Sequence, residues 1–248
     1  MLRRGRFQAR MAETPDDIAA AQALRYRTFI ADTGAALRDG GSDADRFDEI
    51  CSHVMVEDSR DGALVCCFRM LPLSGAEIGN SYSAQYYGLS ALEGYEGRMV
   101  EMGRFCIDPD HARDPDILRV AWGAMTQFVD EQGVDMLFGC SSFHGTETDS
   151  YLDAFAMLKE RHLAPKRWLP KVKAPDVFRF ARRLRRKPDA KAALKTMPPL
   201  LRTYLMMGGW VSDHAVVDHD LNTLHVFTGL EISAVPPARA RALRMVAG

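Results

Sequence analysis

Long hydrophobic runs, cysteine motifs and internal repeats are all missing from this chain of 248 residues. No stretch approaches the roughly 18 uninterrupted apolar residues of a membrane-spanning helix, which excludes such a helix. No apolar run follows the basic residues of the opening MLRRGRFQARMAETPDD, so we expect no secretory signal peptide. With 47% apolar and 26% charged residues, the composition is that of a folded globular protein and excludes a disordered or collagen-like chain.

Cysteine is scarce and shows no ligand spacing. There are five cysteines, an odd number, and no C-x-x-C pair occurs, which disfavours a disulfide framework and a zinc site. Cys66 and Cys67 are adjacent, so on a strand they would point to opposite faces and make a poor metal pair. His214, His219 and His225 show no metal-ligand pattern. We therefore expect free thiols in a reducing compartment, and no bound metal.

The hydrophobic pattern predicts strands and helices in alternation. Residues 7–13 alternate weakly, as a strand does, and the helix start Thr14-Pro15-Asp16-Asp17 follows, with a helix to about Ile30. Residues 33–41 and the long Gly/Ser/Tyr segment 74–97 are expected loops, and loops as long as the second are often functional. The other expected strands are 53–56, 63–71 ended by Pro72, 98–108, 135–143, 210–217 and 224–232, and the other expected helices are 117–132, closed by Gly133, and 150–162.

This order of elements is an α/β pattern that contains neighbouring strands as well as β-α-β crossovers. Its natural solution is one mixed central sheet with helices on both faces. We expect a single domain over residues 1–248, with a basic helical segment at about 159–202 and C-terminal strands after it.

Charge is balanced over the whole chain, at a formal net charge of −1, but it is unevenly distributed. The segment 159–202 holds fifteen Lys or Arg residues and three Asp or Glu residues, a local net charge of +12, which leaves −13 for the remainder. Such an asymmetry predicts a surface for a negatively charged partner: a nucleic acid, a membrane face or an acidic protein. A solvated helix face is the plainer alternative.

Four sequence motifs follow one another along the first half of the chain: LRYRTF at 24–29, DADRFDE at 43–49, VCCFRMLPL at 65–73 and VEMGRFCID at 100–108. Together they resemble the acyl-homoserine-lactone synthases and their relatives, the ornithine-acyl-carrier-protein N-acyltransferases, which have a GNAT-like acyltransferase fold. The later PPLLRTYLMMGGWV at 198–211 and DHDLNTLHVF at 218–227 resemble the C-terminal part of the aminolipid acyltransferases. The resemblance implies an enzyme that moves a 3-hydroxyacyl group from acyl carrier protein to the α-amino group of ornithine, giving lyso-ornithine lipid.

Two departures from related patterns narrow the expected substrates. Lactone synthases usually carry a tryptophan before the paired aspartates, which helps to hold S-adenosylmethionine, and none occurs between Ile30 and Asp43. GNAT enzymes that use acetyl-CoA carry a glycine-rich loop for the pyrophosphate, whereas the corresponding DPDHARDPDILR contains no glycine. A phosphopantetheine arm on a carrier protein needs no pyrophosphate site. We therefore expect acyl carrier protein as the partner and no separate cofactor.

Acyl transfer to an amine requires an amine without its extra proton, close approach to the thioester and donors for the developing oxyanion. Glu101 is the candidate general base, with its pKa raised by burial or with a water relaying the proton. A salt bridge to a neighbouring arginine is its structural alternative. Gly103 fits a bulge or close backbone approach in this strand, which would free N–H groups for the thioester oxygen. Arg104 would position Glu101, the acceptor carboxylate or the carrier arm.

The other candidate site residues would bind substrate. Asp45 and Asp48 are three residues apart and would face one cationic group, such as an ammonium of ornithine; a solvated acidic loop is the alternative. The resemblance assigns Arg25, Phe29 and Arg69 to the acceptor or pantetheine pocket, and structural roles are equally open. The remaining candidates are Ser141 and Ser142, which would contact the pantetheine; no G-x-S-x-G motif surrounds them to support a hydrolase.

Alternative functions remain open at this point. The same chemistry with glutamine or another amino acid as acceptor is the nearest, and an acyl-homoserine-lactone synthase is the next. A binding module for lipid or nucleic acid is a different class, although no nucleic-acid motif is visible and we expect no nucleic-acid partner. The basic segment interleaves Phe178, Phe180 and Leu184 with arginines, which suits peripheral contact with the inner membrane and equally suits carrier-protein docking. We expect a cytoplasmic protein.

Overall fold

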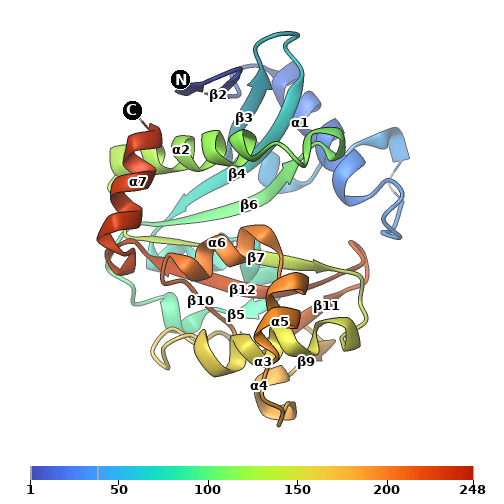
Figure 1. The fold of residues 1–248 in the computed structure, drawn as a ribbon, viewed down its shortest axis with the longest axis vertical. Helices are drawn as coiled ribbons and strands as arrows, with labels where there is room; N and C mark the ends of the chain where they lie inside the picture. The colour runs from blue at the N-terminus through green and yellow to red at the C-terminus, as the bar shows by residue number, and fades with distance from the viewer. Residues whose placement is uncertain (1, 38, 248) are drawn as a thin grey trace. The chain divides into compact units, whose positions relative to one another are not determined.

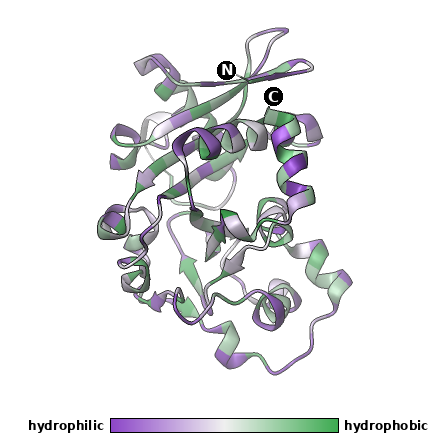
Figure 2. Cartoon of the chain, turned by 90° about the vertical axis from the view of Figure 1, so that its left-hand side faces the viewer, coloured by the Kyte–Doolittle hydropathy of each residue, from purple (hydrophilic) through white to green (hydrophobic). Residues whose placement is uncertain are grey.

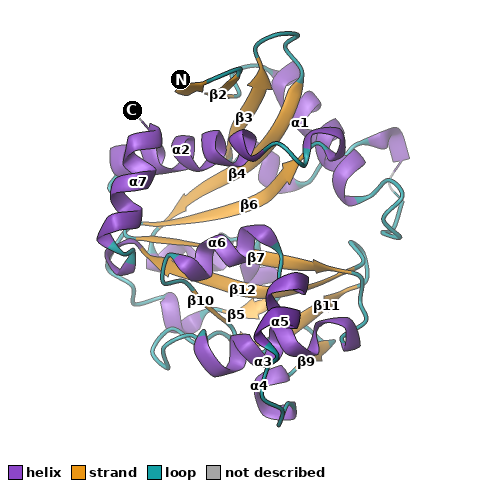
Figure 3. Cartoon of the chain, viewed as in Figure 1, coloured by secondary structure: helices purple, strands orange, loops and turns teal. Residues whose placement is uncertain are grey.

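The computed structural model describes residues 2–37 and 39–247, which form two compact units (Figure 1). Unit 1 comprises Met1–Pro72, Glu101–Val134 and Pro236–Gly248, and unit 2 comprises Leu73–Val100 and Asp135–Val235. Both units contain strands and helices (Figure 3). The expected single domain over 1–248, which includes three residues outside the described ranges, stays a prediction.

Unit 1 is built on strands in the order β1-β2-β3-β4-β6, of which the first four pair antiparallel. The expectation that Pro72 ends its strand is wrong, because β4 continues to Leu73. Pro72 lies beyond Met70, the last residue paired with β3, so β3 does not require the N–H that proline lacks. The strands are β1 (Leu2–Arg4), β2 (Phe7–Met11), β3 (Ser52–Asp58), β4 (Leu64–Leu73) and β6 (Met99–Ile107), the last of which joins unit 1 from Glu101 onward.

Capping explains the ends of the main helices of unit 1, which are α1 (Pro15–Phe29), α2 (Pro115–Gln132) and α7 (Pro237–Ala247). The predicted start of α1 is confirmed: the Thr14 hydroxyl accepts from the Asp17 N–H, and the Asp17 carboxylate accepts from the Thr14 N–H. The predicted end of α2 is also confirmed, at Gly133 with a left-handed φ of 59°. The sequence did not predict α7, which packs against α2 and mixes hydrophilic with hydrophobic residues (Figure 2).

Unit 2 contains a second group of strands in the order β7-β12-β11-β9, with β10 also paired to β12. Its longest pairing joins β7 and β12 antiparallel over nine residues. Phe143 of β7 and Leu224 and Val226 of β12 pack with Phe155 of α3 (Leu152–Arg161) in one buried cluster. The strands are β7 (Met136–His144), β9 (Val177–Phe178), β10 (Trp210–Val211), β11 (Ala215–Asp218) and β12 (Thr223–Glu231).

The basic segment 159–202 is not one continuous helix. After the end of α3 it contains the two-residue strands β8 (Lys171–Val172) and β9, and the helices α4 (Phe180–Arg183), α5 (Ala190–Thr196) and, at its end, α6 (Pro199–Met206). Prolines at positions 165, 170, 175, 188 and 198 interrupt it, since proline lacks the N–H that a helix interior needs. The positive charge is therefore carried on several short elements.

The long segment 74–97, expected as a loop, is ordered by short turns. It contains the 3₁₀ helices η3 (Gly75–Asn80), η4 (Ser83–Gln85) and η5 (Ser90–Leu92). Between the last two lies β5 (Tyr87–Gly88), which pairs with β8. The side chains of Tyr87 and Leu92 are almost fully buried, so this segment is part of the packed interior of unit 2.

Gly75 makes a close approach that predicts a stability defect on substitution. A Cβ at this position would lie 2.5 Å from the carbonyl oxygen of Glu93, 2.7 Å from that of Tyr95 and 2.9 Å from that of Leu92. We expect Gly75→Ala to lower the free energy of unfolding by about 1–3 kcal/mol, because backbone must move to admit the methyl group. Gly79→Ala in the same 3₁₀ helix meets nothing within 4 Å and is the matched control. Urea denaturation of both variants provides the measurement, and equal stabilities would contradict the prediction.

Candidate active site

Three arginines and three aspartates form a closed network inside unit 1. The arginines come from α1, β4 and β6, and the aspartates come from residues 43–48, which lead into the 3₁₀ helix η2 (Arg46–Glu49). The members are Arg25, Asp43, Arg104, Asp45, Arg69 and Asp48, here called the charge ring. In this order, each aspartate bridges the two arginines beside it, so that charges alternate around the ring.

Arg25 joins two aspartates from the buried face of α1. Its Nε lies 3.0 Å from Asp43 Oδ2, and its Nη1 and Nη2 lie 2.7 and 2.9 Å from the two carboxylate oxygens of Asp48. Nη2 also donates to the backbone carbonyl of Asp43. Because the Arg25 side chain is 1% exposed, its bidentate grip on Asp48 is shielded from water.

Arg69 and Arg104 complete the ring from the strands. Arg69 Nη1 lies 2.5 Å from Asp45 Oδ1 and 2.9 Å from Asp48 Oδ1. Arg104 Nε lies 2.9 Å from Asp43 Oδ2, and its Nη2 lies 3.4 Å from Asp45 Oδ2. The side chain of Asp45 is 20% exposed, the most accessible of the six. Any polar contact from outside the ring would therefore reach Asp45 most readily.

The ring shifts the pKa values of three of its members, Asp48, Asp45 and Arg25. Burial alone would raise the pKa of Asp48, but the hydrogen bonds and charge of Arg25 outweigh it, and the pKa lies well below its usual value. Burial would also raise the pKa of Asp45, but the hydrogen bond and the charge of Arg69 outweigh it, and the pKa of Asp45 is lowered. Burial would lower the pKa of Arg25, yet Asp48 and Asp43 raise it. Asp45, Asp48 and Arg25 are thus held in their charged forms.

The backbone distortion expected in β6 lies at Arg104 and not at Gly103. Arg104 has a φ of 52°, in the left-handed region that non-glycine residues seldom adopt, whereas Gly103 does not. The ion pairs of Arg104 with Asp43 and Asp45 stabilise this conformation. Gly103 has open space where a Cβ would lie, so packing within the protein does not require glycine there.

Glu101 lies three residues before Arg104 on β6 and is 4% exposed. Its neighbours Val100 and Met102 are buried as well. Cys51 lies within electrostatic reach of Glu101 and Arg69, and burial raises the pKa of its thiol to about 11. The candidate base is therefore an interior carboxylate beside the charge ring, and not a surface group.

Sequence reasoning missed two residues of this region. Asp43, inside the DADRFDE motif, is not among the predicted site residues, although it bridges Arg25 and Arg104 with a fully buried side chain. His53 of β3 contacts the Asp48 carbonyl through Nε2 at 3.1 Å, and burial lowers its pKa. The position of Asp43 in the same acidic motif as Asp45 and Asp48 is a sequence signal that could have identified it. No sequence signal points to His53, which only the fold brings to this region.

The remaining predicted residues lie elsewhere. Phe29 ends α1 and packs against a small buried cluster that includes Cys67 and Cys106. Ser141 and Ser142 belong to β7 of unit 2: Ser141 is buried and its Oγ accepts from Thr228 Oγ1 at 3.0 Å, whereas Ser142 is exposed. The structure thus brings five of the predicted residues together in the charge ring, and it places Glu101 and Gly103 on the same strand as Arg104. The predicted contacts of these residues with substrate stay predictions.

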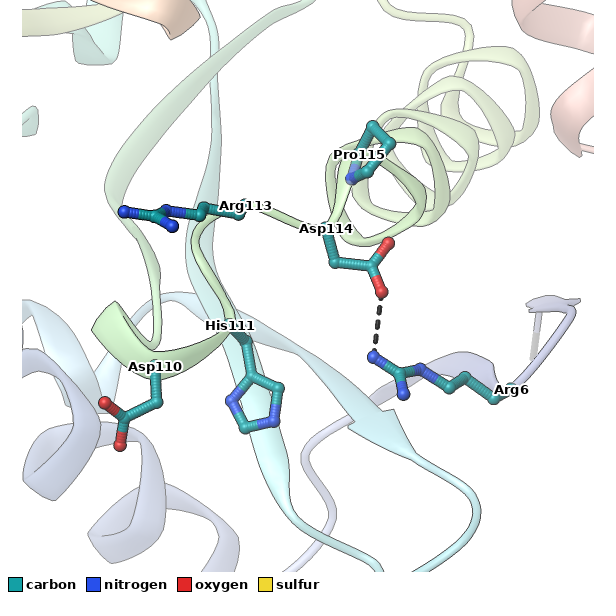
Figure 4. Close-up of a pocket in the computed structure, with 6 residues that line it drawn as sticks. All are labelled: Arg6, Asp110, His111, Arg113, Asp114 and Pro115. Carbon is teal, nitrogen blue, oxygen red and sulfur yellow. Dashed lines mark hydrogen bonds and ion pairs between the residues drawn. The ribbon is translucent and has the colours of Figure 1, made fainter.

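A second feature of unit 1 is a pocket of about 440 Å³ at the N-terminus of α2 (Figure 4). Asp114 occupies that N-terminus: its carboxylate accepts from the Asp116 N–H at 3.0 Å and from Arg6 Nη2 at 2.8 Å. A negative charge therefore already lies where the helix would attract an anion. The lining residues are Arg6, Asp110, His111, Arg113, Asp114 and Pro115.

The part of the chain that the structure describes contains neither a metal-binding cluster nor a membrane-spanning helix. No group of three or more His, Cys, Asp or Glu side chains in residues 2–37 and 39–247 could hold a metal ion. No helix in the same ranges has the length and apolar character required to cross a membrane.

Known proteins resemble this chain in sequence and in fold. Residues 24–123 match the acetyltransferase (GNAT) domain family. The L-ornithine N(alpha)-acyltransferase of Rhodobacter capsulatus is 31% identical over 239 residues, covering 92% of this chain and 91% of that protein. FeeM, an N-acyl amino acid synthase from uncultured soil microbes, superposes with a TM-score of 0.50 at 12% identity, over 98% of this chain and 97% of the other.

A CoA-dependent acyl-homoserine lactone synthase superposes with a TM-score of 0.52 at 13% identity, over 95% of this chain and 83% of the other. At such low identity these two structures bear on the fold alone. They and the family match confirm the predicted fold class, a GNAT-like α/β domain with helices packed around a mixed sheet. The chain is an acyltransferase, as the resemblance of its motifs implied.

The charge ring predicts different costs for two arginines on one helix. Arg25→Met would leave Asp43 and Asp48 buried without their partner, and we expect a loss of about 3–5 kcal/mol in the free energy of unfolding. Arg27→Met, two residues along α1, removes only an exposed pair with Asp108 and should cost less than about 1 kcal/mol. Urea denaturation distinguishes them, and equal losses would show that the ring does not contribute as described.

The lowered pKa of Asp48 predicts acid sensitivity. The pKa of Asp48 is lower in the folded chain than in the unfolded chain, so its carboxylate stabilises the fold at any pH above the pKa of the unfolded state. That stabilisation is lost as the pH falls from the unfolded-state pKa through the folded-state pKa. We expect the free energy of unfolding to decline below about pH 4. Asp48→Asn should decline less steeply, because asparagine takes up no proton. Identical slopes in urea titrations from pH 5 downward would refute this assignment.

Proposed function

The chain belongs to the family of the L-ornithine N(alpha)-acyltransferases, and from that premise we propose that it transfers a 3-hydroxyacyl group from acyl carrier protein to the α-amino group of ornithine. The product is lyso-ornithine lipid, and the reaction takes place in the cytoplasm. The observation that carries the catalytic part of this proposal is the buried carboxylate of Glu101 on the strand distorted at Arg104.

In the proposed reaction the amine nitrogen attacks the thioester carbon, so that a C–N bond forms and the C–S bond breaks. The amine gives up a proton to Glu101, directly or through a water, and the departing pantetheine thiolate takes up a proton. Thiolate leaves readily, so no covalent intermediate on the enzyme is needed. The interior position of Glu101, on the strand that also carries Gly103 and Arg104, supports this role.

The distorted strand supports the second requirement of the reaction. Arg104 departs from regular strand geometry, and such a departure can release nearby N–H groups from the strand ladder. In this proposal, such groups beside the glycine stabilise the developing oxyanion. The open space at Gly103 favours close approach of a thioester, because no Cβ occupies it. Arg104 is a positioning residue whose guanidinium holds the strand to the charge ring.

The N-terminus of α2 supports the proposed acyl donor. A CoA thioester brings a pyrophosphate, and the carboxylate of Asp114 already caps this helix and would repel it. The segment that precedes the helix also lacks the glycines that allow backbone to surround a pyrophosphate. A carrier protein brings the same pantetheine arm without a pyrophosphate. These observations favour acyl carrier protein over acyl-CoA.

The acceptor follows from family membership, with a smaller contribution from geometry. Asp45 is the ring member with exposed surface, and it is the residue proposed to meet an ammonium group of ornithine. Asp48 and Arg25, each at most 5% exposed, hold the ring in place, which is a positioning role. Glutamine would lack the distal ammonium. A lactone synthase would require a site for S-adenosylmethionine, and the tryptophan usual for that substrate is absent.

The function is tested by supplying the complete set of substrates. Purified protein is incubated with 3-hydroxyacyl carrier protein and, separately, with ornithine, glutamine, lysine or S-adenosylmethionine, and products are identified by mass spectrometry. We expect N-acylornithine as the main product and slower reaction when 3-hydroxyacyl-CoA replaces the carrier-protein donor. Acylation of glutamine alone would change the acceptor, and no acylated product with any amine would refute the enzymatic proposal.

Substitution of the proposed base gives a sharper test. We expect Glu101→Gln to lower kcat by about 10²-fold or more while leaving the thermal unfolding midpoint nearly unchanged, because glutamine matches the shape but accepts no proton. Glu49→Gln is the control, because Glu49 is exposed in η2 of the same unit. Turnover of Glu101→Gln within threefold of the unmodified protein would remove Glu101 from the mechanism.

A further inference from the structure

A strongly basic surface lies on unit 2, on the short helices α4 and α5 and the loop between them. Both helices pack beside α3 (Figure 1). Six exposed side chains on these elements form no ion pair within residues 2–37 and 39–247: Arg182, Arg183, Arg185, Lys187, Lys191 and Lys195. We call these six side chains the basic surface.

The nearby acidic groups do not cancel this charge. Asp189 is the one acidic residue between Arg182 and Lys195, and its carboxylate caps α5 by accepting from the Lys191 and Ala192 N–H groups. Asp153 of α3 pairs at 2.8 Å with Arg186, which is not one of the six. The six cations are thus left to attract an external partner.

Three apolar residues at the start of this segment, Phe178, Phe180 and Leu184, pack inward. Phe178 is 8% exposed and Phe180 is 0% exposed, and both lie in the core cluster with Phe155. Leu184 is half-buried and packs against the same cluster. The expectation that these three residues interleave with arginines on a membrane-binding face is therefore wrong. Stable attachment to a bilayer needs inserted apolar groups in addition to charge, and this surface offers little for insertion.

Leu194 is the one large apolar side chain of α5 that faces outward, at 48% exposed. It lies beside Lys195 and three residues after Lys191, so a small apolar contact is flanked by positive charge. Protein interfaces commonly have this arrangement of an apolar centre with a charged rim. Charge at the rim speeds association and permits rapid release, which a donor that must leave after each turnover requires.

We propose, on the basis of the function proposed above, that the basic surface docks acyl carrier protein. Carrier proteins are typically acidic, so they complement the six cations, and the exposed Leu194 supplies an apolar contact on the same helix as Lys191 and Lys195. The surface recognises the protein part of the donor, whereas the charge ring and Glu101 act on the thioester and the amine. Charge reversal at the basic surface should consequently weaken donor binding without changing the chemical step.

The test compares two charge-reversed proteins with a matched control. The first variant carries Arg182→Glu, Arg183→Glu and Arg185→Glu, and the second carries Lys191→Glu and Lys195→Glu. If one variant fails to fold, the other still tests the proposal. The control carries Arg3→Glu, Arg4→Glu and Arg241→Glu, which are exposed residues of unit 1. Binding of labelled holo-acyl carrier protein is followed by fluorescence anisotropy. Turnover is measured with the carrier-protein donor and with 3-hydroxyacyl-pantetheine, which lacks the protein.

We expect at least a tenfold rise in Kd and in KM for the carrier-protein donor in both surface variants, and turnover with 3-hydroxyacyl-pantetheine within threefold. The control should remain within threefold throughout. Unchanged Kd in the surface variants would overturn the proposal, as would equal losses with both donors. Loss of binding to phosphatidylglycerol vesicles with unchanged carrier-protein binding would assign the surface to a membrane and also overturn it. Surface-dependent binding without any turnover would support the docking surface while refuting the proposed function.

Discussion

The alternation of three guanidinium groups with three carboxylates inside unit 1 is the constraint on which the candidate site depends. Charged groups of this kind are costly to remove from water, and they are tolerated here because each carboxylate bridges two arginines. The arrangement demands that α1, residues 43–48, β4 and β6 be held in one relative position. A small error in any of them would leave a buried charge without its partner.

That demand accounts for the unusual backbone of β6. A regular strand would direct the Arg104 side chain by simple alternation, whereas the left-handed conformation at this residue accompanies its ion pairs with Asp43 and Asp45. The cost of such a conformation is of order 1–3 kcal/mol, and it persists where surrounding contacts fix it. The same strand carries Glu101, the interior carboxylate, three residues before Arg104.

Electrostatics also separates two kinds of recognition in this chain. The charge ring is neutral as a whole and largely closed to water, which suits fine positioning of small groups. The segment 159–202 carries a net charge of +12, and much of that charge is exposed on short elements of unit 2, which suits long-range attraction. The capped N-terminus of α2 contributes a third effect, because its own carboxylate occupies the position where an anion would bind.

Local sequence determined much of the architecture. The capping residues Thr14 and Gly133, together with the alternation of apolar residues, indicated the main helices and strands, because these signals act within a few residues. The motifs identified the acyltransferase family and most members of the charge ring. Only the tertiary structure decided that Asp43 belongs to the ring and that the β6 distortion lies at Arg104. It also decided that the phenylalanines of the basic segment point inward, because partners distant in the chain set each of these features.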